Sequence, residues 1–461
     1  MSVSANPARY RAWLACTPLL LVSALLLGVP FLVSALRSVV VADAFDLSAY
    51  AGLLDSSFLA VLGRSLGFAG LVALGCLLLG VPTAHALVRF PPAPRRLLLV
   101  AIGTSFLAGT LIRSYAWLAI FGAHGLVNTI HHWLGGVQPL HLAFTYGSML
   151  LAGIQVELPL FVLPLYAVMR QLDPRLERAA RNLGADPVTA WFTVVLPQAL
   201  PGLASATLLV FLTAMSFFAI PALLGPPDTY LLSQELEVRI NTLGDNAGAS
   251  ARIVVMMLLV AGAAALWAAG RRGLSAVGRQ VERGRVMDGL VLALQRAAAW
   301  VSPWRQVPVW GGCAISFVLL VVPVLVIAPL GVSDDAYLHF PPSAFSLRWA
   351  EHYLGDPDLL ESTGFSLWIG SAAALLSTAI GALAALALGR LGPRARTLVT
   401  LAALAPLVVS PMSMTASLYL LALQWSWLGP AALFVAVYTV MGLPYGFLLV
   451  GAAAARLDPR L

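Results

Sequence analysis

The feature of this sequence that most restricts its fold is a series of apolar stretches, several of which exceed the ~20 residues that a helix needs to cross a bilayer. Of the 461 residues, 60% are hydrophobic and only 10% are charged, a balance far from that of soluble domains. Stretches of this length and composition are typical of membrane-spanning helices. The sequence therefore predicts an all-α polytopic membrane protein.

Ten spans are expected, at about residues 13–40, 58–88, 97–121, 143–169, 203–224, 253–269, 308–330, 364–388, 398–423 and 431–455. The first is longer than the apolar region of a signal peptide and has no convincing cleavage site after it, so it is expected to be retained. Cys16, Cys76 and Cys313 all fall within spans, where a buried apolar role is expected rather than a disulfide or a metal site.

Charged residues divide unevenly between the two sides of this topology. The proposed inner side holds 21 of the 27 arginines, no lysine occurs, and the proposed outer loops hold 13 of the 20 acidic residues. This asymmetry follows the positive-inside rule and puts the N-terminus in the cytoplasm. The net charge of +7 therefore reflects orientation in a membrane and does not indicate nucleic-acid binding.

A polar segment at residues 172–202 separates two of these spans and carries strong local signals. Asp173 and Asp186 are suited to cap helices, because a carboxylate accepts hydrogen bonds from the free N–H groups of a first helical turn. A proline follows each of them, at the position where a missing N–H group does no harm. Gly184 lies between the two and is free to adopt the positive φ that ends a helix.

These signals predict a helical hairpin. Its first helix runs from about Pro174 to Leu183, and its second runs toward Leu196 and is broken by Pro197 and Pro201. The Ala179-Ala180 pair leaves one face of the first helix shallow enough to seat in a groove of another protein.

The same residues resemble the cytoplasmic loop signature of binding-protein-dependent ABC import permeases. That signature is Glu-Ala-Ala, three residues, Gly, nine residues and Ile-x-Leu-Pro; here Arg178 stands in the Glu position, Glu177 lies one residue earlier, and Val194 replaces Ile. The resemblance implies that the loop docks onto a separate ATPase subunit and transmits its closure to the membrane helices. The docking residues that it implies are Asp173, Pro174, Glu177, Arg178, Ala179, Ala180, Gly184, Ala185, Leu196 and Pro197.

Other stretches are similar to one branch of these permeases. Residues 111–117, 125–128, 158–166 and 218–225 resemble the spermidine/putrescine branch, and residues 340–342 and 345–349, with the downstream Ser366, resemble that branch's partner permease. The resemblance implies a multi-pass permease of the bacterial inner membrane, importing a small solute handed over by a periplasmic binding protein. Polyamines are the favoured solute, and ferric iron and 2-aminoethylphosphonate are the alternatives. The implied partners are a cytoplasmic ATPase dimer, the binding protein, membrane lipid and, as a further option, a second permease chain.

The chain also repeats itself. Asp173-Pro174-Arg175-Leu176 recurs at 458–461, an offset of 285, and Ser65-Leu66 recurs at 366–367, an offset of 301. The repeat predicts two permease subunits in one polypeptide: six spans in residues 1–270, an arginine-rich cytoplasmic linker at 271–307 with an interfacial helix at 286–299, and four spans in 308–461. We expect a fused permease cut short at its second docking loop, with a naturally short chain as the alternative.

The absence of lysine limits the chemistry of the chain. A Walker A loop needs a lysine at the phosphates, so the sequence cannot supply a conventional P-loop ATPase. We therefore expect a transport permease without catalytic residues, cofactor or metal of its own, with ATP and Mg²⁺ bound by the partner ATPase. Two rival classes remain: an ion-coupled secondary transporter, which would need several coupled ionisable groups in its spans, and a non-transporting scaffold or sensor.

Glu157 is the best candidate for a residue of the translocation pathway. It lies near the middle of a predicted span, where an ionised group is expensive and should face a cavity or a partner rather than lipid. A carboxylate there would attract the ammonium groups of a polyamine; the alternatives are an internal pair with Arg113 or a protonated, hydrogen-bonded carboxyl group. Further pathway candidates are Arg113, Ser114, Tyr115 and Ser216.

Overall fold

The structure is a computed structural model of the chain and describes residues 7–41, 44–281, 307–408, 414 and 429–454. The expected interfacial helix at 286–299 and the recurring motif at 458–461 lie outside the described residues. The expected span at 398–423 lies partly outside them.

The described residues confirm the predicted all-α membrane class. They contain eight helices that are long and apolar enough to cross a membrane, or nine if one bent pair counts as a span. These eight cover residues 10–37, 56–89, 146–169, 187–214, 246–263, 310–330, 357–390 and 431–451. The only sheet in the described part of the chain is a short antiparallel pair, β1 (Val40–Val41) and β2 (Ala44–Phe45).

The expectation of one continuous span at 97–121 is wrong. The segment forms α5 (Pro92–Leu107) and α6 (Thr110–Phe121), which α7 (Leu126–Trp133) follows, and the chain bends by 105° between α5 and the later helices. Ala108 and Gly109 both have extended backbone, with ψ of 126° and 147°. Two consecutive extended residues interrupt the i to i−4 hydrogen bonds, so the helix cannot continue through them.

The expected break at Pro197 and Pro201 is also wrong. The helix α11 (Leu196–Ala214) includes both prolines. The helix is continuous from Pro187 to Ala214 and passes through a π-helical turn at Trp191–Val195 just before the two prolines, so both prolines lie inside a helix. This span therefore begins before residue 203 and ends at Ala214, and the short α12 (Ala219–Leu224) is separate from it.

The first part of the predicted linker is helical. The helix α14 (Asn246–Val281) begins before the expected span at 253–269 and continues past Arg271, Arg272 and Arg279. The arginine-rich segment therefore begins as an extension of a span.

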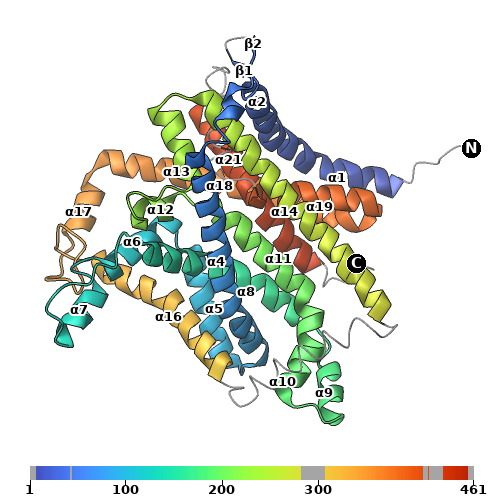
Figure 1. Cartoon of the computed structure of the whole chain (residues 1–461), viewed down its shortest axis with the longest axis horizontal. Helices are drawn as coiled ribbons and strands as arrows, with labels where there is room; N and C mark the ends of the chain where they lie inside the picture. Colours follow the sequence, from blue (N-terminus) through green and yellow to red (C-terminus); the bar gives the residue numbers. More distant parts are fainter. Residues whose placement is uncertain (1–6, 42–43, 282–306, 409–413, 415–428, 455–461) are drawn as a thin grey trace, which may run out of the picture. The chain divides into compact units, whose positions relative to one another are not determined.

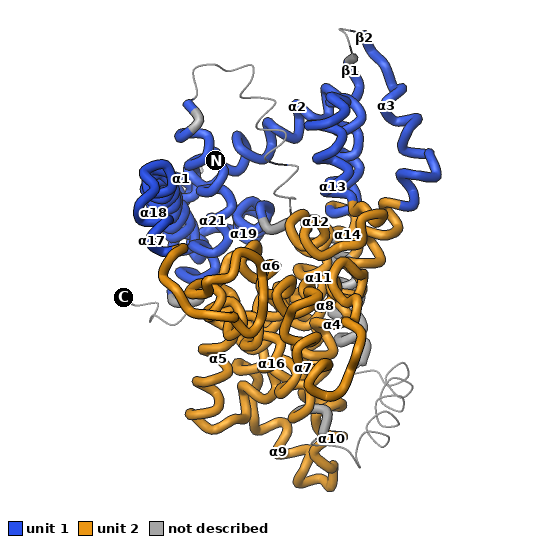
Figure 2. The backbone as a smooth tube through the Cα atoms, turned by 90° about the vertical axis from the view of Figure 1, so that its left-hand side faces the viewer, with its two compact units in different colours: residues 1–60, 232–260, 350–461 blue, residues 61–231, 261–349 orange. Residues whose placement is uncertain are grey.

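The chain forms two compact units, each built from separate stretches of sequence (Figure 2). Unit 1 comprises residues 1–60, 232–260 and 350–461, and unit 2 comprises residues 61–231 and 261–349.

In unit 2, the helix α8 (Tyr146–Met169) lies at the centre of the apolar core. Phe161 and Leu158 of α8 are fully buried together with Phe68 of α4 (Ser56–Arg89). The helix α16 (Val307–Leu330) packs against α5 and α6, and Thr83 of α4 donates a hydrogen bond of 2.8 Å to the hydroxyl of Ser316.

In unit 1, the helix α18 (Pro357–Ala387) packs along α21 (Pro430–Ala454), and α1 (Pro7–Ser23) and α19 (Pro393–Val408) pack beside them. Cys16 of α1 is fully buried against α18. The first helix of the chain thus packs with helices from its second half, while α16, from the second half, packs with helices of the first.

The helix bounds recur along the chain. Residues 56–89 of α4 correspond to 357–390 at an offset of 301, and α5 corresponds to α19 at the same offset. Residues 146–169 of α8 correspond to 431–454 of α21 at an offset of 285. These are the two offsets at which the sequence motifs recur.

Candidate functional site

The polar segment at 172–202 forms the predicted hairpin, which lies at one end of unit 2 (Figures 1 and 2). Its helices are α9 (Pro174–Asn182) and α10 (Pro187–Ala190). Asp173 caps α9 by accepting from the N–H of Arg175 at 2.8 Å, and Asp186 caps α10 by accepting from the N–H of Thr189 at 2.7 Å. The two predicted N-caps are confirmed.

The turn between the two helices has the predicted glycine conformation. Gly184 has φ +94°, and the N–H of Ala185 donates to the carbonyl of Ala180 at 3.1 Å. This backward bond satisfies a carbonyl at the end of α9, which would otherwise have no partner within the helix. After α10 the chain continues through a π-helical turn, η2 (Trp191–Val195), into the first turn of α11, where Leu196 and Pro197 lie.

Two side chains near the end of α4 hold the hairpin. The guanidinium of Arg89 donates to both carboxylate oxygens of Glu177 in α9. One turn earlier, His85 accepts a hydrogen bond of 3.0 Å at Nδ1 from the indole N–H of Trp191. Residues four apart lie on one face of a helix, so a single face of α4 contacts both arms of the hairpin.

These two attachments were not predicted from the sequence. The available signal was the spacing of His85 and Arg89, which puts two polar side chains on one helix face at the end of an apolar span. The spacing alone does not identify Glu177 and Trp191 as the partners, because those residues are distant in sequence.

The alanine pair does not form a single outward face. Ala179 is exposed, whereas Ala180 is half-buried and turned toward the protein. The outward apolar surface of α9 is formed instead by Ala179 with Leu176 and Leu183, whose exposed fractions are 47% and 90%. Neighbouring residues on a helix point about 100° apart, which explains why one alanine of the pair turns inward.

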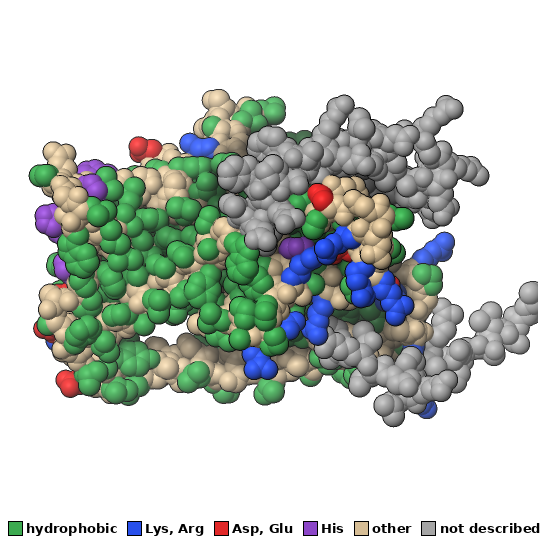
Figure 3. All heavy atoms as spheres, turned by 90° about the horizontal axis from the view of Figure 1, so that it is seen from below, with side chains coloured by type: hydrophobic (Ala, Val, Ile, Leu, Met, Phe, Trp, Pro, Cys, Tyr) green, Lys and Arg blue, Asp and Glu red, His purple; other side chains and the backbone are tan. Residues whose placement is uncertain are grey.

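Charged side chains gather near the hairpin. Figure 3 shows a group of arginine side chains toward the end of unit 2 that carries α9 and α10, and histidine side chains toward the end that carries α7. The helix α9 carries Arg175, Arg178 and Arg181, and all three are exposed.

Glu157 lies in a buried polar cluster in the middle of unit 2. Its side chain is only 4% exposed, and its Oε2 accepts a hydrogen bond of 2.9 Å from the hydroxyl of Thr213 in α11. Arg113 of α6 is buried nearby and donates to the backbone carbonyl of Val156 at 3.3 Å. Among the ion pairs of the described residues, none joins Arg113 to Glu157. In the part of the chain that the structure describes, Glu157 therefore accepts a hydrogen bond from Thr213 and forms no ion pair with Arg113.

The cluster continues on another side of α8 through Gln155. Its amide donates to the hydroxyl of Ser105 in α5 at 2.8 Å and accepts from the indole of Trp117 in α6 at 3.4 Å. Residues two apart on a helix point in different directions, so Gln155 and Glu157 join α8 to different neighbours. Gln155, Ser105 and Thr213 were not predicted as members of this cluster, since uncharged polar residues are common in spans.

The remaining pathway candidates lie in different surroundings. Ser114 is buried and donates to the carbonyl of Thr110 at 2.9 Å, and Ser216 donates to the carbonyl of Leu212 at 3.3 Å just after the end of α11. Tyr115 is 45% exposed. The structure thus brings Arg113 close to the backbone beside Glu157 and directs Tyr115 elsewhere.

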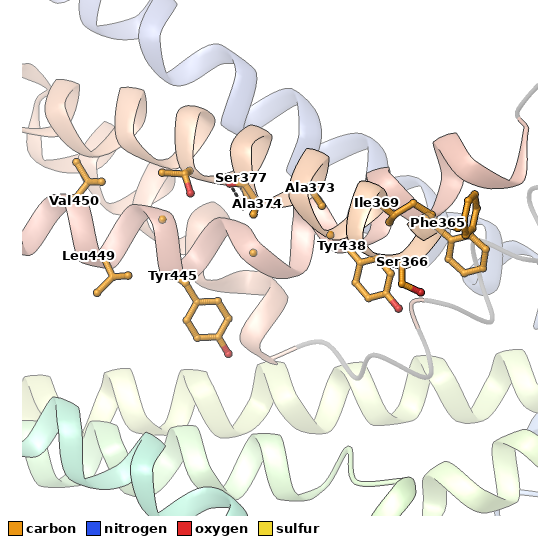
Figure 4. A pocket seen from close by; sticks show the side chains of 15 residues that line it. Phe365, Ser366, Ile369, Ala373, Ala374, Ser377, Tyr438, Tyr445, Leu449 and Val450 are labelled. Atoms are coloured by element: carbon orange, nitrogen blue, oxygen red, sulfur yellow. Dashed lines mark hydrogen bonds between the residues drawn. The ribbon is translucent and has the colours of Figure 1, made fainter. Parts of the chain in front are cut away.

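A groove of about 720 Å³ runs between α18 and α21 in unit 1 (Figure 4). Its lining is mostly apolar, with hydroxyl-bearing side chains at Ser366, Ser377, Thr378, Tyr438 and Tyr445. Gly442, the repeat counterpart of Glu157, also lines it. The two halves of the chain therefore differ in charge at corresponding positions.

Comparisons with known proteins find relatives among transport permeases. No family model matches the chain. The chain is 33% identical over 220 residues to the spermidine/putrescine transport system permease protein PotB of Salmonella typhimurium, a match covering 47% of this chain and 77% of the relative. It is 34% identical over 176 residues to a putative 2-aminoethylphosphonate transport system permease protein, PhnU, of Salmonella typhi, covering 37% of this chain and 61% of the relative. Among solved structures, a bacterial ABC transporter involved in alginate import aligns with a TM-score of 0.46 at 15% identity, over 53% of this chain and 88% of that one.

Proposed function

Because this chain belongs to the ABC transporter permease family, as its relatives show, we propose that it moves a small cationic solute across the inner membrane by alternating access driven by a partner ATPase. The chain is a multi-pass inner-membrane protein and a transport permease, not itself an enzyme. ATP hydrolysis is assigned here to a separate cytoplasmic subunit, and ATP and Mg²⁺ bind to that subunit.

The single observation that carries the proposal is the hairpin. It is capped at both helix starts by Asp173 and Asp186, turned at Gly184, and held to a membrane-spanning helix through Glu177 and Trp191. A segment attached in this way transmits a push to the spans, because both of its arms contact α4 and its second arm continues directly into α11. The proposal requires the hairpin to lie in the cytoplasm, and hence the N-terminus as well, as the arginine distribution supports.

We propose further that the polypeptide contains two permease repeats. The recurring bounds of α4 with α18 and of α5 with α19 support this reading. The match to PotB supports it too, since 220 residues make up 77% of that relative but only 47% of this chain.

A polyamine is the proposed solute, and a periplasmic binding protein its donor. The support is the likeness to a permease named for spermidine and putrescine, together with the buried carboxyl group of Glu157, which suits a cation. The likeness to a permease named for 2-aminoethylphosphonate supports that solute as the second candidate. Ferric iron is a further candidate solute, and an ion-coupled secondary transporter is disfavoured by the family.

Uptake into proteoliposomes tests the proposal. We expect the full-length chain, assembled with its ATPase and binding protein, to import labelled spermidine only when ATP is inside. Gly184→Val should abolish uptake, because a β-branched residue is strained at φ +94°. Gly135→Val is the matched control, since Gly135 has φ +93° but lies beside α7, outside the hairpin. Import without a nucleotide-hydrolysing subunit would refute the proposal. Import of 2-aminoethylphosphonate but not of spermidine would show that 2-aminoethylphosphonate is the solute.

A further inference from the structure

The outward face of α9 has a specific chemistry, and from it we infer the chemistry of the surface that receives it. We propose that α9 docks in a groove of the partner ATPase whose floor is apolar and whose rim carries carboxylates. This inference rests on the proposed function, and it adds the sign of the charge on the partner.

The geometry of α9 divides its residues into two rows on the solvent side. Leu176, Ala179 and Leu183 follow a spacing of three and four residues, which places them along one ridge, and all three are exposed. Arg175 and Arg178 form a second exposed row beside that ridge, and Arg181 extends it around the helix. An apolar ridge flanked by cations fits a groove with an apolar floor and an acidic rim.

The carboxylates near this face are already engaged. Asp173 and Asp186 cap α9 and α10, and Glu177 is turned toward α4, where Arg89 holds it. By contrast, Arg178 donates only one weak bond among those described, of 3.4 Å, to the carbonyl of Pro174 in its own helix. A guanidinium group has five N–H donors, so most of its binding capacity faces outward.

The arrangement of α9 favours a protein partner over a lipid surface. Figure 1 shows α9 at the far tip of the hairpin, beyond the ends of α5 and α8 in unit 2. Leu183 at the tip is 90% exposed, and the arginine row continues along the same helix. Arg95 and Arg96 lie instead near the start of α5, at the end of an apolar segment, where anionic headgroups would be their natural partners.

The departure of this chain from the loop signature agrees with this inference. Arg178 occupies the position at which the signature carries Glu, so the charge presented there is reversed. A partner that receives Arg178 favourably needs a carboxylate at that point, because like charges in contact are unfavourable. The inference therefore predicts selectivity among ATPases by charge.

Binding of purified ATPase to the full-length chain in nanodiscs tests the inference. We expect the double variant Arg175→Glu/Arg178→Glu to weaken binding at least tenfold at low salt, and the wild-type affinity to fall as salt screens the contact. Leu183→Asp should weaken binding at any salt concentration, because it charges the apolar ridge. The matched control is Arg95→Glu/Arg96→Glu, which makes the same change in net charge away from α9 and should bind ATPase as the wild type does.

Each outcome bears on a separate claim. Unchanged or tighter ATPase binding by Arg175→Glu/Arg178→Glu, with normal wild-type binding, would overturn the acidic rim and leave the proposed function standing. Failure of the wild-type chain to bind any ATPase would overturn the proposed function itself. If the α9 arginines alter only the preference for phosphatidylglycerol over phosphatidylcholine nanodiscs, the surface binds lipid and the inference is wrong.

Discussion

The indole N–H of Trp191 donates to Nδ1 of His85 across 3.0 Å, and this contact joins the second arm of the hairpin to α4. The two rings meet edge-on with their centroids 5.8 Å apart. Arg89, one turn further along α4, holds the first arm through Glu177. With both arms attached to one helix face, we expect a displacement of the hairpin to move α4 as well as α11.

Removing the acceptor at His85 should uncouple the hairpin from α4. We expect His85→Leu to lower the solute imported per ATP hydrolysed, because the Trp191 N–H loses its partner. The stability loss should be about 1–3 kcal/mol, the usual range for an orphaned buried donor, and toward the low end here since Trp191 is only half-buried. His85→Gln retains an acceptor and is the control. If His85→Leu and wild type import the same amount of solute per ATP hydrolysed, this contact has no role in coupling the hairpin to α4.

A charge exchange tests the other attachment. Arg89→Glu and Glu177→Arg should each reduce ATP-dependent uptake, because each puts like charges together, and the double exchange should restore most of it. An ion pair as exposed as this one contributes only about 0–1 kcal/mol to folding, so thermal unfolding should change little in any variant. If the double variant is as impaired as the worse single variant, the pair does not transmit the movement.

Local signals made the hairpin predictable. The helix starts at Asp173 and Asp186 and the turn at Gly184 depend on residues within a few positions of each other, and the structure has all three. The same local reasoning failed at Pro197 and Pro201, because a membrane-spanning helix that is held by its neighbours tolerates prolines in its interior. It also failed at Ala108 and Gly109, where no proline marks the bend.

Long-range packing could not be predicted from the sequence. The partner of Glu157 is Thr213, 56 residues away, and hydropathy does not indicate which of the nearby spans supplies it. Nor did the repeat reveal that α1 packs with α18 while α16 packs with α5 and α6. Those pairings depend on side-chain shape, as at Cys16 against α18 and Thr83 against Ser316.

The close approach of α18 and α21 predicts a position-specific cost for an added methyl group. A Cβ at Gly381 would lie 2.6 Å from the backbone nitrogen of Phe447, so Gly381→Ala must push the two helices apart. We expect a loss of about 3 kcal/mol, the upper part of the usual overpacking range. Gly364→Ala, in the same helix with open space around it, should be neutral or stabilising, since alanine favours helix by about 1 kcal/mol over glycine. Unfolding measured in detergent compares the two; equal stability of both variants would contradict the packing.

Substitutions at Glu157 and Thr213 should separate stability from transport. Thr213→Val removes the donor to a buried carboxyl group, and we expect it to lower stability by about 1–3 kcal/mol. Glu157→Gln keeps an acceptor for Thr213 and should fold normally, yet import spermidine at least tenfold more slowly if the carboxylate attracts the cation. Unfolding curves and initial uptake rates measure the two effects. Wild-type uptake by Glu157→Gln would exclude Glu157 from the pathway.

The loop between α16 and α17 (Arg348–Gly355) should respond to acid through Asp335. The hydroxyl and N–H of Ser343 and the hydroxyl of Ser333 all donate to this carboxylate and lower its pKa to about 2. A carboxylate whose folded pKa is depressed stabilises the loop above its unfolded pKa of about 3.9, and that contribution is lost as the pH falls from there toward about 2.

Hydrogen–deuterium exchange of residues 333–345 measures this contribution, when variants are compared at the same pH so that intrinsic exchange rates cancel. At about pH 6 we expect Asp335→Asn to exchange faster than wild type, and at about pH 2 the difference should shrink, because about half of the wild-type carboxylate is then protonated. Asp358→Asn, in the first turn of α18, is the control and should leave this loop unchanged. A difference between Asp335→Asn and wild type that persists undiminished at the lower pH would show that the charge of Asp335 does not order the loop.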